Sequence, residues 1–136
     1  MITAIDTNVL LDVFGADPTF GPRSRDVLQR CIDEGRLIAC EVVWAEIGAC
    51  FPSSDEADAA LEKLGIHFAP TDPASALAAG SAWRVYRRRG GPRTRVLPDF
   101  LIGAHALAQA DRLLTRDAKF HRSYFPSLQL LDPSSS

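Results

Sequence analysis

Four acidic residues in this chain stand in apolar sequence, where a carboxylate is costly to desolvate because burial favours its uncharged form. They are Asp6, Glu46, Asp99 and Asp117. Asp6 closes the short apolar run 2–5, and Asp99 opens the apolar stretch 100–107. If the four converge, a hard divalent cation such as Mg²⁺ would offset their mutual repulsion, because it prefers oxygen ligands. The set therefore predicts metal-assisted phosphodiester chemistry.

Two of these acids lie in expected helices. Around Glu46, at about 100° per residue, the neighbours three and four positions away are all apolar, so we expect Glu46 on the buried stripe of its helix. Asp99 falls in a first helical turn, where the helix dipole favours an acid. Four residues later Gly103 has no side chain, which leaves room beside the Asp99 carboxylate.

The order of the expected elements indicates where the acids lie. Strands alternate with helices, which predicts an α/β fold: a single domain over residues 1–132 with a central parallel sheet of four to five strands flanked by helices. Residues 133–136 are expected to form a disordered tail. The expected strands are 2–5, 37–40, 66–69, 112–115 and 128–131, and the helices include 24–34, 41–51, 73–89 and 99–110. In such sheets, sites form beyond the carboxyl ends of the strands, so Asp6 and Asp117 are expected at the same edge.

Four motifs carry the acids in this order: IDTNVLLD at 5–12, WAEI at 44–47, PDFLIGAHA at 98–106 and LLTRD at 113–117. Together they resemble the PIN-domain ribonucleases, and among them the VapC-type toxins of bacterial toxin–antitoxin pairs. The resemblance implies an endoribonuclease dependent on Mg²⁺ or Mn²⁺, inhibited by a cognate antitoxin and usually dimeric. By motif match, the catalytic acids are Asp6, Glu46, Asp99 and Asp117, and the supporting polar residues are Thr7, Asn8 and Thr115.

Within that set we expect different roles for the acids. Mg²⁺ keeps several waters and takes few protein ligands, so direct ligation by all four is not expected. Asp6 and Asp99 are the expected direct ligands, with Glu46 and Asp117 acting directly or through water. Polar neighbours commonly orient such carboxylates, and the candidates for that role are Asn8 and Thr115.

An arginine-rich segment precedes Asp99 by a few residues. One interpretation is a patch that binds RNA phosphates; the other is a solvated helix end, where the dipole favours cations. Both stay open on the sequence alone. Arg116, inside the last motif, is expected to face the substrate, with a salt bridge to the acids as the alternative. The candidate RNA-binding residues are Arg87, Arg88, Arg89, Arg93, Arg95 and Arg116.

The remaining titratable residues carry weaker signals. His67 is expected to be structural, in a strand. His105 lies about 120° round the helix from the acid that opens it, which argues against a role as metal ligand. His121 is expected in a loop. The other acids near the motifs, Asp12 and Asp111, are interpreted as helix-surface residues.

Composition sets broad limits. A chain of 136 residues with a formal charge of −2 is long enough for one core, and its charge identifies no partner. The three cysteines, Cys31, Cys40 and Cys50, lack CxxC spacing and are expected to be buried reduced thiols. No leader-like start and no apolar run of about 20 residues is present, which predicts a cytoplasmic protein outside the membrane.

Two other functional classes stay open. A PIN-like module without catalysis would bind RNA or protein through the same fold. A Mg²⁺-dependent aspartyl phosphatase would need a second Asp two residues after its nucleophile and a lysine near the site. Asn8 holds that second position after Asp6, and the chain's lysines are Lys63 and Lys119.

Overall fold

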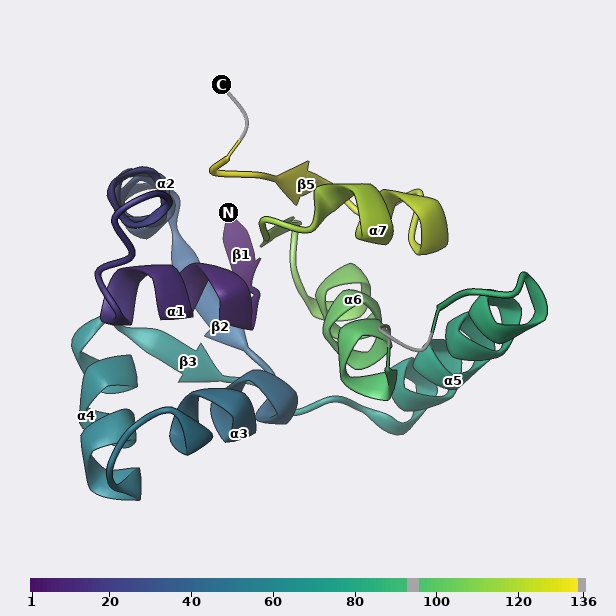
Figure 1. Ribbon diagram of the computed structural model, residues 1–136, viewed down its shortest axis with the longest axis horizontal. Helices are drawn as coiled ribbons and strands as arrows, with labels where there is room; N and C mark the ends of the chain where they lie inside the picture. Colours follow the sequence, from purple (N-terminus) through teal and green to yellow (C-terminus); the bar gives the residue numbers. More distant parts are fainter. Residues whose placement is uncertain (93–95, 135–136) are drawn as a thin grey trace.

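The computed structural model describes residues 1–92 and 96–134, and this part of the chain forms one parallel sheet covered by helices (Figure 1). The strand order is β3-β2-β1-β4-β5, with every neighbouring pair parallel. The strands are β1 (Ile2–Ile5), β2 (Arg36–Ala39), β3 (Ile66–Phe68), β4 (Arg112–Leu114) and β5 (Leu130–Leu131). The expected α/β fold with a parallel sheet is therefore confirmed.

The helices follow the strands in the order expected for crossover connections. Their bounds are α1 (Thr7–Phe14), α2 (Gly21–Glu34), α3 (Glu41–Ala49), α4 (Ser54–Lys63), α5 (Pro73–Arg88), α6 (Leu97–Gln109) and α7 (Ala118–Tyr124). α2 packs on β2, α4 beside β3 and α7 beside β5. None of the helices in the described residues is both long and apolar enough to span a membrane.

The centre of the sheet is the centre of the core. In β1, Ala4 pairs with Ile38 of β2 on one side and Leu113 of β4 on the other, and all three are almost fully buried. Strands covered on both faces are typically near-continuous apolar runs. Each fully buried Leu or Ile side chain contributes roughly 1.5–3 kcal/mol to the stability of the fold. β1 and β4 therefore hold the residues that follow them in fixed positions.

The direction of α6 brings its first turn to the carboxyl edge of the sheet. α6 packs on β1 and β4 and leads into β4. Beyond its C-terminus, Asp111 Oδ2 accepts the Ile2 N–H at 2.6 Å, which marks the amino edge. α6 has 13 residues and is therefore about 20 Å long. Its N-terminal turn, which holds Asp99, lies at the opposite edge, beyond the ends of β1 and β4.

α5 is the outermost helix on its side of the molecule, beside α6 (Figure 1). Its buried residues are Ser75, Ala79 and Tyr86. The Tyr86 ring packs edge to face against Phe100 of α6, at 5.5 Å between centroids. The Tyr86 hydroxyl donates to the Pro92 carbonyl. Leu77, on the other side of α5, is 76 % exposed. α5 thus packs mainly against α6.

His105 lies on the core-facing side of α6 and is 1 % exposed. Burial lowers the pKa of its imidazole below the usual value, although the backbone carbonyl of Ala69 and the carboxylates of Glu41 and Asp72 raise it. Desolvation is the largest of these effects, so the side chain is held as neutral imidazole.

One expectation outside the site differs from the structure. Cys31 and Cys40 are buried, but Cys50 is exposed because it follows the last turn of α3, so its expected burial is wrong. The chain also stays in contact with the domain past residue 132. Pro133 is buried, and the Ser134 carbonyl accepts Nη1 of Arg23 at 3.2 Å; residues 135–136 lie outside the described residues.

Candidate functional site

Asp6 is the centre of a polar cluster at the carboxyl edge. It directly follows β1, occupies the N-cap position of α1 and is buried. Its Oδ2 accepts the Thr115 hydroxyl at 2.7 Å and the Asn8 amide at 3.5 Å. The Nε2 of His121 lies 3.6 Å from the same oxygen. A buried carboxylate needs such donors, and here they converge on one of its oxygens.

Thr115 connects Asp6 to Asp117. Its hydroxyl donates to Asp6 Oδ2 and accepts the Asp117 N–H at 2.9 Å. A threonine hydroxyl has one proton to donate and lone pairs to accept with, so one side chain makes both contacts. Thr115 is fully buried. The expectation that Asp6 and Asp117 lie beyond the same edge of the sheet is met by this arrangement.

Glu46 comes to the cluster from α3. Its Oε1 accepts the Thr7 hydroxyl at 2.7 Å, and Thr7 directly follows Asp6. Its expected burial is wrong, because Glu46 is exposed. The core-facing residues of α3 are Val43 and Ile47, and Glu46 points away from that buried side of the helix. Apolar neighbours on a helix did not guarantee a covering surface.

Asp99 is in the first turn of α6, as expected, and its Oδ2 accepts the Val96 N–H at 3.3 Å. One turn further on, on the same face, a Cβ at Gly103 would lie 3.0 Å from His121 Nδ1. The other ring nitrogen of His121 is the one near Asp6. His121 therefore lies between Asp6 and Gly103, the residue one turn after Asp99.

His121 is a site residue that the sequence reasoning missed. It lies in α7 rather than in a loop and is 2 % exposed. Its ring packs against Phe120 at 5.0 Å and Phe125 at 6.3 Å between centroids. The available signal was its spacing, because a residue four positions after Asp117 shares its face if the segment is helical.

The donor set has the chemistry of a Mg²⁺ or Mn²⁺ site. It consists of carboxylate oxygens with hydroxyl and amide neighbours, which hard cations prefer. Within residues 1–92 and 96–134, no three His, Cys, Asp or Glu side chains are grouped closely enough to hold one ion among them. Mg²⁺ retains much of its water and takes few direct protein ligands, so oxygen donors at this edge fit a hydrated ion.

Arg116 does not point freely toward a substrate. Its Nε lies 2.7 Å from Asp12 Oδ2 and its Nη2 lies 3.1 Å from Asp12 Oδ1. The alternative of a salt bridge is therefore the observed one, although its partner is outside the four acids. Asp12 is 4 % exposed, so its assignment to a helix surface is wrong. Asp111 is exposed, as expected, but it lies between α6 and β4 instead of on a helix.

The arginine-rich segment is described only in part. Arg87 lies over the Trp83 ring at 4.5 Å, and Arg89 lies over the Tyr124 ring at 5.7 Å. Arg88 is also exposed, at the end of α5. These three cations share one end of the outermost helix. The other two candidates of this segment, Arg93 and Arg95, lie outside the described residues.

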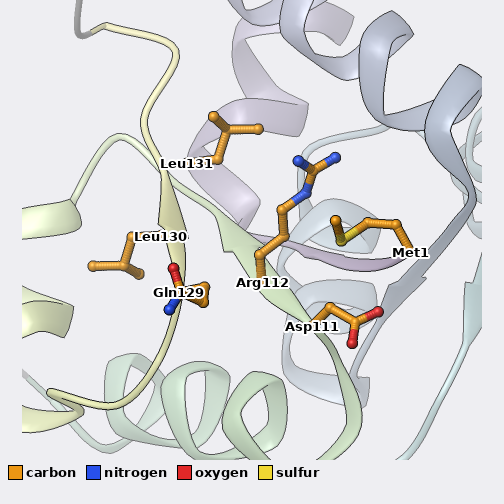
Figure 2. Close-up of a pocket in the computed structure, with 6 residues that line it drawn as sticks. All are labelled: Met1, Asp111, Arg112, Gln129, Leu130 and Leu131. Atoms are coloured by element: carbon orange, nitrogen blue, oxygen red, sulfur yellow. The ribbon is translucent and has the colours of Figure 1, made fainter.

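A pocket of about 550 Å³ lies at the other edge of the sheet, beside the starts of β1 and β4 (Figure 2). Its two charged side chains are already engaged, since Asp111 accepts the Ile2 N–H and the Arg112 Nε donates to Thr3 Oγ1 at 2.9 Å. None of the four acids belongs to the lining that Figure 2 labels. The residues that line it are Met1, Asp111, Arg112, Gln129, Leu130 and Leu131.

Comparisons with known proteins agree with this fold. The family model of the PIN domain matches residues 3–126. The structure of VapBC2 from Rickettsia felis bound to a promoter DNA fragment superposes with a TM-score of 0.75 and 19% identity, covering 97% of this chain and 98% of that chain. VapBC-1 from nontypeable Haemophilus influenzae gives 0.75 and 20%, covering 99% and 100%. DNA-bound VapBC from Salmonella typhimurium gives 0.73 and 16%, covering 98% of each chain.

No curated protein matches the chain. At these identities the structural likeness shows a shared fold only. The match to the family model is made on the sequence itself. It spans nearly the whole chain, including β1, α6 and β4 with the acids beside them. The chain therefore belongs to the PIN domain family.

Proposed function

We propose that the protein is a metal-dependent endoribonuclease, a hydrolase that cleaves RNA phosphodiester bonds. It would act in the cytoplasm as the toxin of a type II toxin–antitoxin pair, as a homodimer inhibited by a cognate antitoxin. The observation that carries the nuclease proposal is the Thr115 hydroxyl, which joins Asp6 and Asp117 at the carboxyl edge of the sheet. The likeness to VapBC structures supports the toxin proposal.

In this proposal the ion keeps much of its water, and the four acids act on it partly through that water. Asp6 and Asp99 ligate it directly, and Glu46 and Asp117 act directly or through water. A bound Mg²⁺ or Mn²⁺ lowers the pKa of a water and offsets negative charge on the phosphate.

The other polar residues hold the acids in place. Thr115 and Asn8 donate to the same oxygen of Asp6, which orients that carboxylate. Thr7 does the same for Glu46 from the next position along the chain. Such supporting contacts matter because loss of a partner behind a metal ligand commonly costs about 10–100-fold in affinity or activity.

The direct test is to incubate the purified protein with total RNA, with either Mn²⁺ or EDTA. We expect defined fragments with Mn²⁺ and intact RNA with EDTA. RNA binding without cleavage in either condition would favour the non-catalytic module. Release of phosphate from a small monoester, with RNA left intact, would favour the phosphatase.

The arginines at the end of α5 are proposed to bind RNA phosphates. Replacing Arg87, Arg88 and Arg89 together by alanine should weaken RNA binding, because each phosphate contact releases counterions. For single strands the slope of log K against log salt changes by about 0.7 per contact, so about 2 for three contacts. Filter binding over a range of salt concentrations measures this slope. Arg93 and Arg95 belong to the same proposal.

The matched control removes the same charge from another helix. The control replaces three exposed arginines of α2, which are Arg23, Arg25 and Arg30. This replacement should leave the slope of log K against log salt unchanged. Equal slopes for the parent and both triple variants would favour the interpretation of the α5 arginines as a solvated helix end.

A further inference from the structure

The turn that holds Asp117 is fastened to α1 by Arg116. The guanidinium bonds both oxygens of Asp12 through Nε and Nη2, at 2.7 and 3.1 Å. A bidentate pair of this kind fixes the orientation of both side chains as well as their distance. Asp12 is in α1 and Arg116 follows β4, so the pair spans 104 residues of sequence.

The surroundings of the pair restrict it further. Ser24, which is fully buried in α2, donates to Asp12 Oδ2 at 2.8 Å. The guanidinium carbon of Arg116 lies 4.0 Å from the centre of the Phe20 ring. The cation is thus held in its plane by a carboxylate and from one face by an aromatic ring. This arrangement resists movement of the turn in more than one direction.

The backbone of the same residue is held by α1 as well. The Arg116 N–H donates to Asn8 Oδ1 at 3.2 Å, and the Asn8 amide points its Nδ2 toward Asp6 Oδ2. Asn8 and Asp12 are one helical turn apart and therefore share a face. That face of α1 holds the main chain and the side chain of residue 116 together.

We propose that Arg116 is a positioning residue. Its pair with Asp12 holds the turn 115–117 so that Asp117 stays beside Asp6, at the separation that a shared ion requires. The need for an ion rests on the proposed function. The role of the Arg116–Asp12 pair in holding the turn does not depend on that function. A direct contact of the guanidinium with RNA is the competing role, and the experiment separates the two.

The first arm measures Mn²⁺ affinity by titration calorimetry and RNA cleavage kinetics. Arg116→Lys keeps the charge but loses the bidentate geometry. We expect it to bind Mn²⁺ about tenfold to a hundredfold more weakly and to lower kcat with KM for RNA unchanged. Arg112→Gln is the matched control, since Arg112 begins β4, the strand that Arg116 follows, but bonds Glu34 and Thr3 at the amino edge; parent values are expected for it.

The second arm measures amide hydrogen exchange without metal. The Arg116 N–H donates to Asn8 Oδ1 of α1, and the Asp117 N–H donates to Thr115 Oγ1. Both should exchange faster in Arg116→Lys and in Asp12→Asn but not in Arg112→Gln. Asp12→Asn combined with Arg116→Gln leaves no unpaired buried charge. This double variant should melt nearer to the parent than Arg116→Gln alone, yet still bind Mn²⁺ weakly.

The outcomes decide the role. Parent Mn²⁺ affinity and parent exchange in Arg116→Lys would overturn the proposal. A raised KM and a flatter salt dependence with unchanged Mn²⁺ affinity would assign Arg116 to RNA binding instead. If the parent protein binds no Mn²⁺ and cleaves no RNA, the proposed function fails, and the exchange arm still decides whether the pair holds the turn.

Discussion

Asp6→Asn is expected to abolish metal-dependent RNA cleavage and most of the stabilisation that Mn²⁺ confers. The substitution removes one negative charge and one hard oxygen ligand from the centre of the cluster, while the side chain keeps its size. A ligand present at a hundred times its Kd stabilises a protein by about 2.7 kcal/mol. For a domain of this size that corresponds to roughly 10 °C in Tm, and the variant should lose most of it.

Thermal melts in EDTA and in saturating Mn²⁺ measure this effect beside the cleavage assay. Asp111→Asn is the matched control, because Asp111 also lies next to a strand end but at the amino edge, bonded to the Ile2 N–H. It should retain parent cleavage and parent Mn²⁺ stabilisation. If Asp6→Asn melted far below the parent in EDTA and still responded fully to Mn²⁺, Asp6 would be a structural cap of α1 instead of a ligand.

Gly103→Ala is expected to destabilise the fold although alanine favours helix. The added Cβ would lie 2.4 Å and 2.6 Å from two ring carbons of Phe125 and 3.0 Å from His121 Nδ1. Phe125 is 5 % exposed and cannot turn aside without moving its neighbours. Overpacking of this kind costs about 1–3 kcal/mol, against a helix gain of up to about 1 kcal/mol. Displacement of His121 should also weaken Mn²⁺ binding.

Urea unfolding measures the free energy of both this variant and a control. Gly48→Ala in α3 is that control, since no heavy atom of the described residues lies within 4 Å of its added Cβ beyond the immediate chain. It should be neutral or stabilising by up to about 1 kcal/mol. Equal stabilisation by both substitutions would show that α6 and α7 pack less closely than the structure indicates.

The fold and part of the site followed from local pattern. β1 and β4 are short apolar runs, and parallel connection places whatever follows them at one edge, which is why Asp6 and Asp117 could be assigned together. Pro98, directly before Asp99, predicted the start of α6, because proline is common in the first turn of a helix. These are inferences from neighbours in sequence, where periodicity carries the information.

What escaped prediction depends on contacts between distant segments. Asp12 looked like a surface acid because its partner Arg116 comes 104 residues later. Glu46 looked buried because its helical neighbours are apolar, but its side chain is exposed, and its bond to Thr7 of α1 joins segments 39 residues apart. His121 was assigned to a loop because the apolar pattern of α7 is too short to identify a helix by periodicity. In each case the missing information was which surfaces meet.

The two contacts of Thr115 also settle which way its hydroxyl proton points. Of its two partners, the Asp117 N–H can only donate and the Asp6 carboxylate accepts, so the single hydroxyl proton is directed to Asp6. The Thr115 hydroxyl therefore has no proton left to donate to a phosphate oxygen of the substrate, although it lies at the centre of the cluster. Substitution by valine, which has a similar volume, would remove the hydrogen bonds to both acids at once. Thr115 therefore positions Asp6 and Asp117 and does not contact the substrate itself.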